Sequence, residues 1–349
     1  MSAAHLSGAD EGTVDGSAAH GSGANEGMVA GSASRSVLVT GAAGYVGGKL
    51  IRALGSGGWR PETVVATDVR LPPRGARLPG ISYELCDVRD GGRLHALVAR
   101  YGVDTVVHLA SVVTPGRDGS TALAYEVDVV GTRNVLSACL TGGVGKLVIT
   151  SSGAAYGYHH DNRPWLDEDD PIRGHDAMAY SRHKRLVEEM LAEARRDHPH
   201  LRQLVFRPGT ILGTGVANPI TDFFDKPMVF GVTGADSPFV FIWDEDVVAC
   251  LVRGLREPVT GIYNLAGEGA LTLRSVADRL GRPYLSLPAW LLTGALHLLR
   301  RLGLTQYGPE QVDFIRYRPV LSNRRLVEEF GYTPRKTSAE VLEFFLEHR

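Results

Sequence analysis

The sequence contains few cysteines. Only three of its 349 residues are cysteines, and Cys86, Cys139 and Cys250 are scattered singly along the chain. Because no C-x-x-C pair occurs, the sequence favours neither a disulfide framework nor a zinc site. We therefore expect no bound metal and a reducing, cytoplasmic location.

A long hydrophobic run is also lacking, because no apolar stretch reaches the length of a transmembrane helix. The nearest candidate covers residues 287–299, is interrupted by His297, and ends at Arg300 and Arg301. We expect a buried or substrate-lining helix there. A helix that lies on a membrane surface is the minor alternative.

Neither sign of charge is in large excess. The formal net charge is −2, so composition gives no global bias toward nucleic acid or an anionic membrane. Hydrophobic residues make up 44% and charged residues 22%, which is ordinary for a soluble globular protein. The length allows one large domain or two closely joined ones. We expect the partner to be a small-molecule substrate rather than nucleic acid.

The first 34 residues form a low-complexity segment. Residues 2–16 and 17–31 read as two copies of one unit rich in glycine, alanine and serine. Such a composition buries little apolar surface, so the segment is predicted to be a disordered tail. It has neither the basic region nor the apolar region of a secretory signal.

A glycine-rich turn follows the first strand-like run. Apolar residues 36–40 precede Gly41, Gly44 and Gly47, and a helical pattern starts at Lys49. This arrangement predicts a cradle for a pyrophosphate, because glycine lets the backbone approach the anion and a helix N-terminus favours negative charge. The spacing is G-x-x-G-x-x-G, not the G-x-G-x-x-G of ordinary dinucleotide dehydrogenases. A glycine turn without a ligand is the alternative.

Strand-like and helical runs alternate from residue 35 to Arg207. Strands are expected at 37–40, 63–67, 81–84, 104–109, 146–150 and 203–206, and long helices at 121–140 and 177–198. This alternation predicts an α/β fold with a Rossmann-type, doubly wound parallel sheet. Residues 208–241 do not show this alternation of strands and helices. Later residues suggest several helices and a short strand at 263–265. We expect a tail at 1–34, a dinucleotide-binding domain at 35–207 and a smaller substrate-binding cap at 208–349, some of whose segments return to the first domain.

Asp68 stands at the end of the second expected strand, about twenty residues after the last glycine of the turn, where a ribose-binding acid is expected. Its carboxylate would accept hydrogen bonds from ribose hydroxyls and repel a 2′-phosphate. The sequence therefore favours NAD over NADP, although Arg70 keeps NADP as the lesser alternative.

Tyr180 and Lys184 lie four residues apart in a helical stretch and so share one face. A lysine ammonium near a tyrosine hydroxyl favours the phenolate, which suits general acid–base chemistry. Ser152 follows the fifth expected strand and could polarise a substrate oxygen. Nearby, Tyr156 is interpreted as a pocket wall, and the acidic run 167–170 as an exposed face.

Taken together, these motifs over residues 35–349 resemble the extended short-chain dehydrogenases/reductases of the NAD-dependent epimerase/dehydratase type. The resemblance implies catalysis by Ser152, Tyr180 and Lys184. It also implies a cofactor site, for which we expect Gly41, Gly44, Tyr45, Val46, Gly47, Asp68, Asp87, Val88, Leu109, Ala110, Tyr180, Lys184 and Pro208. A homodimer through the two long helices is a further implication.

His183 lies between Tyr180 and Lys184 in the sequence but is expected to point away from the face that they share. Two features depart from the family pattern. Asp128 stands where the family usually has asparagine. The segment from Arg207 to Thr210 replaces the Arg-Tyr-Phe-Asn typical of members that act on nucleotide sugars. The resemblance thus implies an oxidoreductase or epimerase, with a reductase of an apolar substrate, similar to 3β-hydroxysteroid dehydrogenase, as the alternative. A dinucleotide-binding regulator without turnover is the rival from another class.

Overall fold

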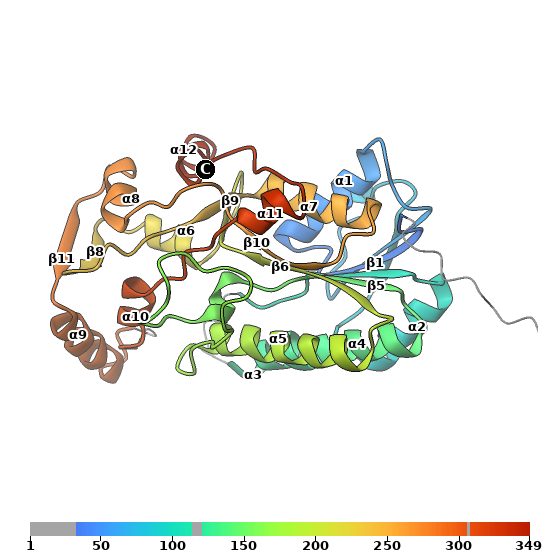
Figure 1. Ribbon diagram of the computed structural model, residues 1–349, viewed down its shortest axis with the longest axis horizontal. Helices are drawn as coiled ribbons and strands as arrows, with labels where there is room; N and C mark the ends of the chain where they lie inside the picture. Colours follow the sequence, from blue (N-terminus) through green and yellow to red (C-terminus); the bar gives the residue numbers. More distant parts are fainter. Residues whose placement is uncertain (1–32, 114–120, 306–307) are drawn as a thin grey trace, which may run out of the picture. The chain divides into compact units, whose positions relative to one another are not determined.

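The structure is a computed structural model that describes residues 33–113, 121–305 and 308–349 (Figure 1). Residues 1–32 of the expected tail lie outside the described residues. The last residue of that expected tail, Ser34, belongs instead to the folded unit. It is buried, and its amide donates to the carbonyl of Leu255 at 2.9 Å.

The centre of the fold is a seven-stranded parallel sheet in the order β10-β6-β5-β4-β1-β2-β3. Its strands are β1 (Ser36–Thr40), β2 (Thr63–Asp68), β3 (Ser82–Leu85), β4 (Thr105–His108), β5 (Lys146–Thr150), β6 (Arg202–Pro208) and β10 (Gly261–Leu265). The strand order reverses between β1 and β4. In such a sheet, the carboxyl ends beside the reversal form a ligand crevice. The predicted Rossmann-type sheet is confirmed.

Helices cover both faces of this sheet (Figure 1). One face carries α1 (Tyr45–Ser56), α7 (Asp244–Arg256) and α11 (Arg324–Glu328), and the other carries α2 (Gly91–Tyr101), α4 (Gly131–Thr141) and α5 (Ala179–Asp197). Strand residues alternate between the two cores. Val37 and Val39 face the first layer of helices, while Leu38 faces the second. Burial on both faces explains why these strands read as continuous apolar runs.

The long helix expected at 121–140 is interrupted. It consists of α3 (Thr121–Tyr125), a π-helical turn (Glu126–Val130) and α4. Asp128 lies in the π-helical turn and is only 2% exposed. Local π-helical turns of this kind are often found at functional sites.

The remaining elements build a smaller region beside the sheet. Two pairs of short strands, β7 (Thr210–Leu212) with β9 (Phe241–Trp243) and β8 (Val229–Val232) with β11 (Tyr284–Leu287), lie among five helices. These helices are α6 (Pro219–Phe224), α8 (Leu273–Arg279), α9 (Ala289–Arg301), α10 (Gln311–Arg316) and α12 (Ser338–Glu347). Phe224, Phe241 and Phe345 belong to a separate core there.

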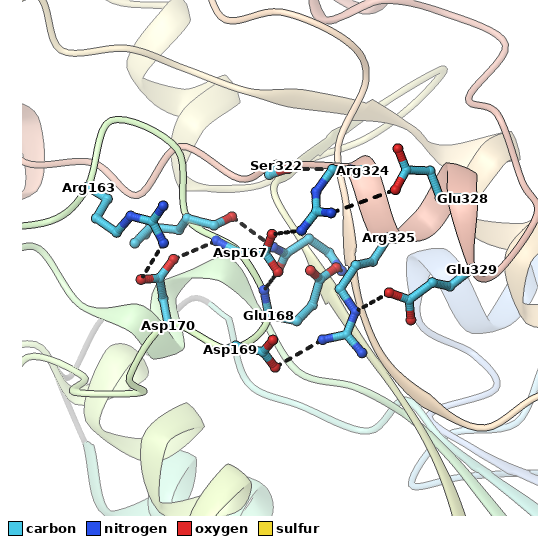
Figure 2. A network of polar contacts seen from close by, with 12 residues as sticks. Arg163, Asp167, Glu168, Asp169, Asp170, Ser322, Arg324, Arg325, Glu328 and Glu329 are labelled. Atoms are coloured by element: carbon cyan, nitrogen blue, oxygen red, sulfur yellow. Dashed lines mark hydrogen bonds and ion pairs between the residues drawn. The ribbon is translucent and has the colours of Figure 1, made fainter.

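The acidic run 167–170 is not simply an exposed face, contrary to expectation. Arg324 of α11 contacts Asp167 at 2.8 Å, and Arg325 contacts Asp169 at 3.0 Å (Figure 2). Glu168 turns inward, where it is 5% exposed. The run therefore ties the loop before α5 to the late helix α11.

Candidate active site

The glycine turn is closely packed against the end of β4. Gly41 has a φ of 70°, and a Cβ atom at this position would come within 2.6 Å of the backbone nitrogen of Ala110. A Cβ atom on Gly47 would lie 2.0 Å from the carbonyl oxygen of Gly41. Neither position has room for a side chain, so the backbone itself forms the surface of the turn. The amides at the start of α1, including those of Tyr45 and Val46, stand at this helix N-terminus.

Asp68 lies beside this turn at the end of β2. Its carboxylate accepts hydrogen bonds from the backbone amide of Ala43 at 3.0 Å and from that of Arg70 at 3.3 Å. The first contact fixes the carboxylate next to the glycine turn. This is the spatial relation that the sequence spacing predicts.

The other expected cofactor residues follow neighbouring strand ends. Asp87 and Val88 come after β3, and Leu109 and Ala110 come directly after β4. Asp87 forms an ion pair with Arg89 at 2.6 Å, and this contact lowers the pKa of its carboxyl. Pro208 is the last residue of β6 and is buried. All these positions lie at the carboxyl edge of one sheet.

The expected catalytic residues meet at the same edge. The Nζ atom of Lys184 lies 5.5 Å from the ring centroid of Tyr180 and donates to the carbonyl of Thr150 at 3.4 Å. Ser152 follows β5 by two residues, and its Oγ accepts the amide hydrogen of Ala154 at 3.1 Å. Ser181 donates to the carbonyl of Ala154 at 2.6 Å and so ties the start of α5 to the segment that carries Ser152.

The profile of the family described as "NAD dependent epimerase/dehydratase family" matches residues 37–266, which is more than half of the chain. The chain belongs to the NAD-dependent epimerase/dehydratase family. This membership confirms the predicted family and its dependence on NAD.

Individual relatives agree with this membership. Sterol demethylase protein B of Methylococcus capsulatus is 30% identical over 331 residues, covering 87% of this chain and 95% of that protein. Among solved structures, UDP-glucose 4-epimerase of Thermotoga maritima with UDP-glucose has a TM-score of 0.69 at 17% identity, covering 90% and 98% of the two chains. The NAD complex of UDP-glucose 4-epimerase from Thermus thermophilus has a TM-score of 0.68 at 22% identity, covering 89% and 98%. The two structural likenesses show the fold.

Tyr45 has a side-chain role that the family pattern does not indicate. Its hydroxyl donates to the carboxylate of Asp244, at the start of α7, and lies 3.2 Å from the carbonyl of Thr214. Lys49 forms an ion pair with the same Asp244 at 3.0 Å. The helix that follows the glycine turn is thereby fastened to α7 and to the segment after β7.

Tyr156 is not a pocket wall, contrary to expectation. It is fully buried, and its hydroxyl accepts from Arg207 at 2.8 Å and lies 2.9 Å from Oδ1 of Asn264. Arg207 is itself held by two hydrogen bonds to Glu188, at 2.9 and 3.0 Å. Burial raises the pKa of Tyr156 far above its usual value, despite the opposing effect of Arg207. This tyrosine is part of a buried polar cluster and stays protonated.

The sequence did not reveal that Asp128 and His183 lie together. The two side chains are 2% and 0% exposed, and Nδ1 of His183 lies 3.6 Å from Oδ2 of Asp128. The other oxygen of Asp128 accepts the amide hydrogen of Val112 at 3.0 Å. Burial alone would raise the pKa of Asp128, but His183, Lys184 and the Val112 amide outweigh it and lower the pKa. A buried carboxylate and imidazole thus stand beside Lys184.

A chain of hydrogen bonds connects β1 with the π-helical turn that contains Asp128. Nδ1 of His108 lies 2.7 Å from Oγ1 of Thr40, and Nε2 lies 3.1 Å from Oγ1 of Thr132. Thr132 donates in turn to the carbonyl of Asp128 at 2.5 Å. Burial lowers the pKa of His108 to about 3, so the imidazole is neutral at physiological pH.

Aromatic side chains cluster around Tyr158, whose pKa is affected by Tyr180. Tyr158 contacts Phe314 with a centroid distance of 5.0 Å, and the guanidinium of Arg318 lies 4.6 Å from Phe314 and 4.0 Å from Phe239. Burial raises the pKa of Tyr158 to about 12, with a lowering contribution from Arg318 and a raising one from Tyr180. A hollow of about 390 Å³ lies next to this cluster. Its lining includes His175, Ala177, Trp290, Val312 and Arg316.

Two kinds of feature are lacking within residues 33–113, 121–305 and 308–349. No helix in these ranges has the length and apolar character needed to span a bilayer. Nor do His, Cys, Asp and Glu side chains in the same ranges gather in groups of three or more that could hold a metal ion.

Proposed function

We propose that the chain catalyses NAD-dependent oxidation or reduction at a carbon that bears a hydroxyl or carbonyl group. Tyr180, Lys184 and Ser152 are the proposed catalytic residues. The observation that carries the proposal is the position of the Lys184 ammonium, 5.5 Å from the Tyr180 ring and hydrogen-bonded to Thr150. This pair stands at the same sheet edge as the glycine turn.

The residues at the turn fit a dinucleotide. A pyrophosphate needs backbone that it can approach closely, and Gly41 and Gly47 provide this where a Cβ atom would collide with backbone. The Asp68 carboxylate, fixed by the Ala43 amide, is proposed to accept hydrogen bonds from the adenosine ribose. Asp87, Val88, Leu109, Ala110 and Pro208 are proposed to complete the site along the strand ends.

NAD, when bound, accepts or supplies the hydride. The chain's own residues handle the proton and the substrate oxygen. In the oxidative direction Tyr180 acts as the phenolate and takes the hydroxyl proton as the carbon loses its hydride, and in the reductive direction the neutral tyrosine donates its proton to the substrate oxygen. The positive charge of Lys184 stabilises the phenolate form of Tyr180 that each direction requires. Ser152 holds the substrate oxygen by a hydrogen bond, which orients the reacting carbon.

For the substrate we propose an apolar alcohol or ketone rather than a nucleotide sugar. Tyr158, whose pKa is raised in part by Tyr180, packs against Phe314, and Arg318 lies over Phe314 and Phe239. The relative at 30% identity is named a sterol demethylase protein. The segment Arg207 to Pro208 ends β6 within a buried cluster, in place of the Arg-Tyr-Phe-Asn segment typical of nucleotide-sugar enzymes. Epimerisation is the second candidate, because the family and several structural neighbours include epimerases.

Two measurements test this function. Mass spectrometry of the purified protein, with calorimetric titration of NAD and NADP, reports the cofactor. A screen of sterols, other apolar alcohols and UDP-sugars, followed at the absorbance of NADH, reports the reaction. Release of NADH with an apolar alcohol supports the proposal, and conversion of UDP-sugars without net NADH supports the epimerase. Binding of NAD without exchange of hydride on any member of the panel would favour the non-catalytic regulator.

The predicted homodimer through α3–α4 and α5 stays a prediction. Light scattering of the purified chain measures it directly, and a monomeric mass at micromolar concentration contradicts it.

A further inference from the structure

Helix α9 is apolar and yet unburied. None of its residues, Ala289–Arg301, is buried, and Trp290 is 75% exposed. Leu298, Leu302 and Leu304 are 57%, 61% and 71% exposed. The helix lies at the outer end of the smaller region, beside α10 and remote from the central sheet (Figure 1). Large apolar patches on a folded surface generally mark an interaction site.

The end of α9 is basic, although Glu310 and Asp313 line the hollow beside Trp290. Arg300 and Arg301 close the helix, and the sequence has no acidic residue between Asp278 and Glu310. This local excess of positive charge does not show in the formal net charge of the whole chain, which is −2. Arg300 lies 3.7 Å from Glu310, so the pair is loose, and both arginines at the end of α9 are exposed.

We propose that α9 and the turn after it dock the protein on the surface of an anionic lipid bilayer. Leucines and an exposed tryptophan suit the boundary between headgroups and acyl chains. Arginines at the end of the same helix suit anionic headgroups, which attract basic residues close to the membrane surface. The helix then lies in the plane of the membrane and does not cross it.

A second copy of the chain fits this patch less well. A two-fold symmetric contact brings each patch against itself, so both copies would contribute the same basic helix end to the interface. An excess of one charge on both sides of an interface opposes association. The apolar face accepts either partner, whereas Arg300 and Arg301 favour an anionic one.

Docking would also bring the active site close to the bilayer in which a lipid-soluble substrate is dissolved. Trp290 of α9 lines the hollow of about 390 Å³ that also contacts His175 and Ala177. These two residues precede Tyr180 by five and three positions. This last consequence rests on the proposed function, whereas docking itself does not.

Vesicle co-sedimentation of the full chain tests the proposal. We expect binding to vesicles of phosphatidylcholine mixed with phosphatidylglycerol, at least tenfold weaker binding to phosphatidylcholine alone, and a decrease with added salt. The variants Leu298→Gln/Leu302→Gln and Arg300→Gln/Arg301→Gln should each weaken binding at least tenfold. Leu123→Gln and Arg196→Gln, on the exposed surface of α3 and α5, serve as matched controls and should bind as the unchanged protein does.

Circular dichroism and the thermal midpoint establish that each variant is folded. The proposal is overturned by the absence of vesicle binding, by equal binding to both kinds of vesicle, or by control variants that lose binding as the α9 variants do. It is also overturned by a dimer in light scattering that the Leu298→Gln/Leu302→Gln variant abolishes, because the face then belongs to a second copy. NADH formation from a soluble alcohol, measured without vesicles, tests the proposed function separately.

Discussion

The imidazole of His183 faces the carboxylate of Asp128 across 3.6 Å, and both side chains are almost completely buried. Lys184 follows His183 in the chain, and its charge contributes to the lowered pKa of Asp128. The carboxylate is therefore charged at neutral pH. A buried Asp–His pair thus lies beside Lys184, and a change to one member of the pair is expected to affect the other.

We expect Asp128→Asn and His183→Gln to be energetically coupled. Removal of one member of a buried pair leaves the other poorly compensated, so each single change should destabilise the protein. The double variant should be more stable than the sum of the single losses, with a coupling of about 1–3 kcal/mol. Urea unfolding of the four proteins measures this coupling, and additive losses would contradict it.

Gly47→Ala should disrupt the glycine turn. The new Cβ would approach the carbonyl oxygen of Gly41 to 2.0 Å, so the turn must shift. We expect a loss of about 1–3 kcal/mol in the free energy of unfolding, together with weaker NAD binding. Gly48→Ala is the matched control, because its nearest contact is 3.7 Å away. That variant should keep NAD affinity and gain about 0.5–1 kcal/mol from helix propensity. Equal NAD affinities for the two variants in calorimetry would count against the cradle.

Asp68→Ala should change the cofactor preference. The substitution removes the charge that would repel a 2′-phosphate and the acceptor proposed for the ribose. We expect the ratio of NAD to NADP affinity to fall at least tenfold, or about 1.4 kcal/mol. Asp68→Asn keeps an acceptor for the Ala43 amide and so separates loss of charge from loss of the turn contact. An unchanged ratio in both variants would remove Asp68 from the cofactor site.

Tyr180→Phe should lower kcat about 10²- to 10⁴-fold on the substrate found by screening, because general acid–base catalysis is lost. NAD affinity should change little. Tyr158→Phe is a stringent control, since Tyr158 adjoins the site but its pKa of about 12 keeps it protonated at neutral pH. We expect that variant to retain activity within a few-fold. Full activity of the Tyr180→Phe protein would refute the mechanism.

Glu168 predicts a dependence of stability on pH. Burial raises the pKa of its carboxyl to about 7, from an unfolded value of 4.5, although the Asn264 amide opposes the shift. The folded state therefore binds this proton more tightly, and the free energy of unfolding should fall as the pH rises from about 4.5 to about 7. The Glu168→Gln variant has no titratable group at this position, so its free energy of unfolding should not show this fall. Its stability relative to the unchanged protein should rise by about 1–3 kcal/mol over that range, since each pKa unit corresponds to about 1.4 kcal/mol. Urea unfolding at several pH values measures the slope, and parallel curves would contradict the prediction.

The features that sequence predicts here are local in the chain. Residues 36–47 carry their strand, turn and helix in one continuous segment, and Tyr180 and Lys184 are four residues apart, so periodicity alone places them together. Asp68 requires only the length of one strand–helix–strand unit. In each case the geometry follows from backbone periodicity and short connections.

Features that depend on tertiary packing cannot be predicted from the sequence in this way. The meeting of His183 with Asp128 depends on how α5 packs against the π-helical turn, and nothing local to either residue indicates it. The buried position of Tyr156 likewise depends on Arg207, which lies 51 residues along the chain and donates to its hydroxyl. The short strands β7, β8, β9 and β11 have three or four residues, too few for an alternating pattern to be recognised.

The chain leaves the central sheet after β6 and returns to it only at β10, whose five residues pair with β6 in parallel. A fragment that ends near Arg207 would expose the β6 edge, which invites intermolecular pairing. Part of the smaller region, from β7 to β9, is therefore an insert inside this one crossover connection, whereas α8, β11, α9, α10 and α12 follow β10. The loops of this insert can lengthen, shorten or be exchanged between two fixed ends while the sheet remains intact. For protein engineering, the segment between β6 and α7 is thus suited to replacement as one piece when substrate specificity is to be altered.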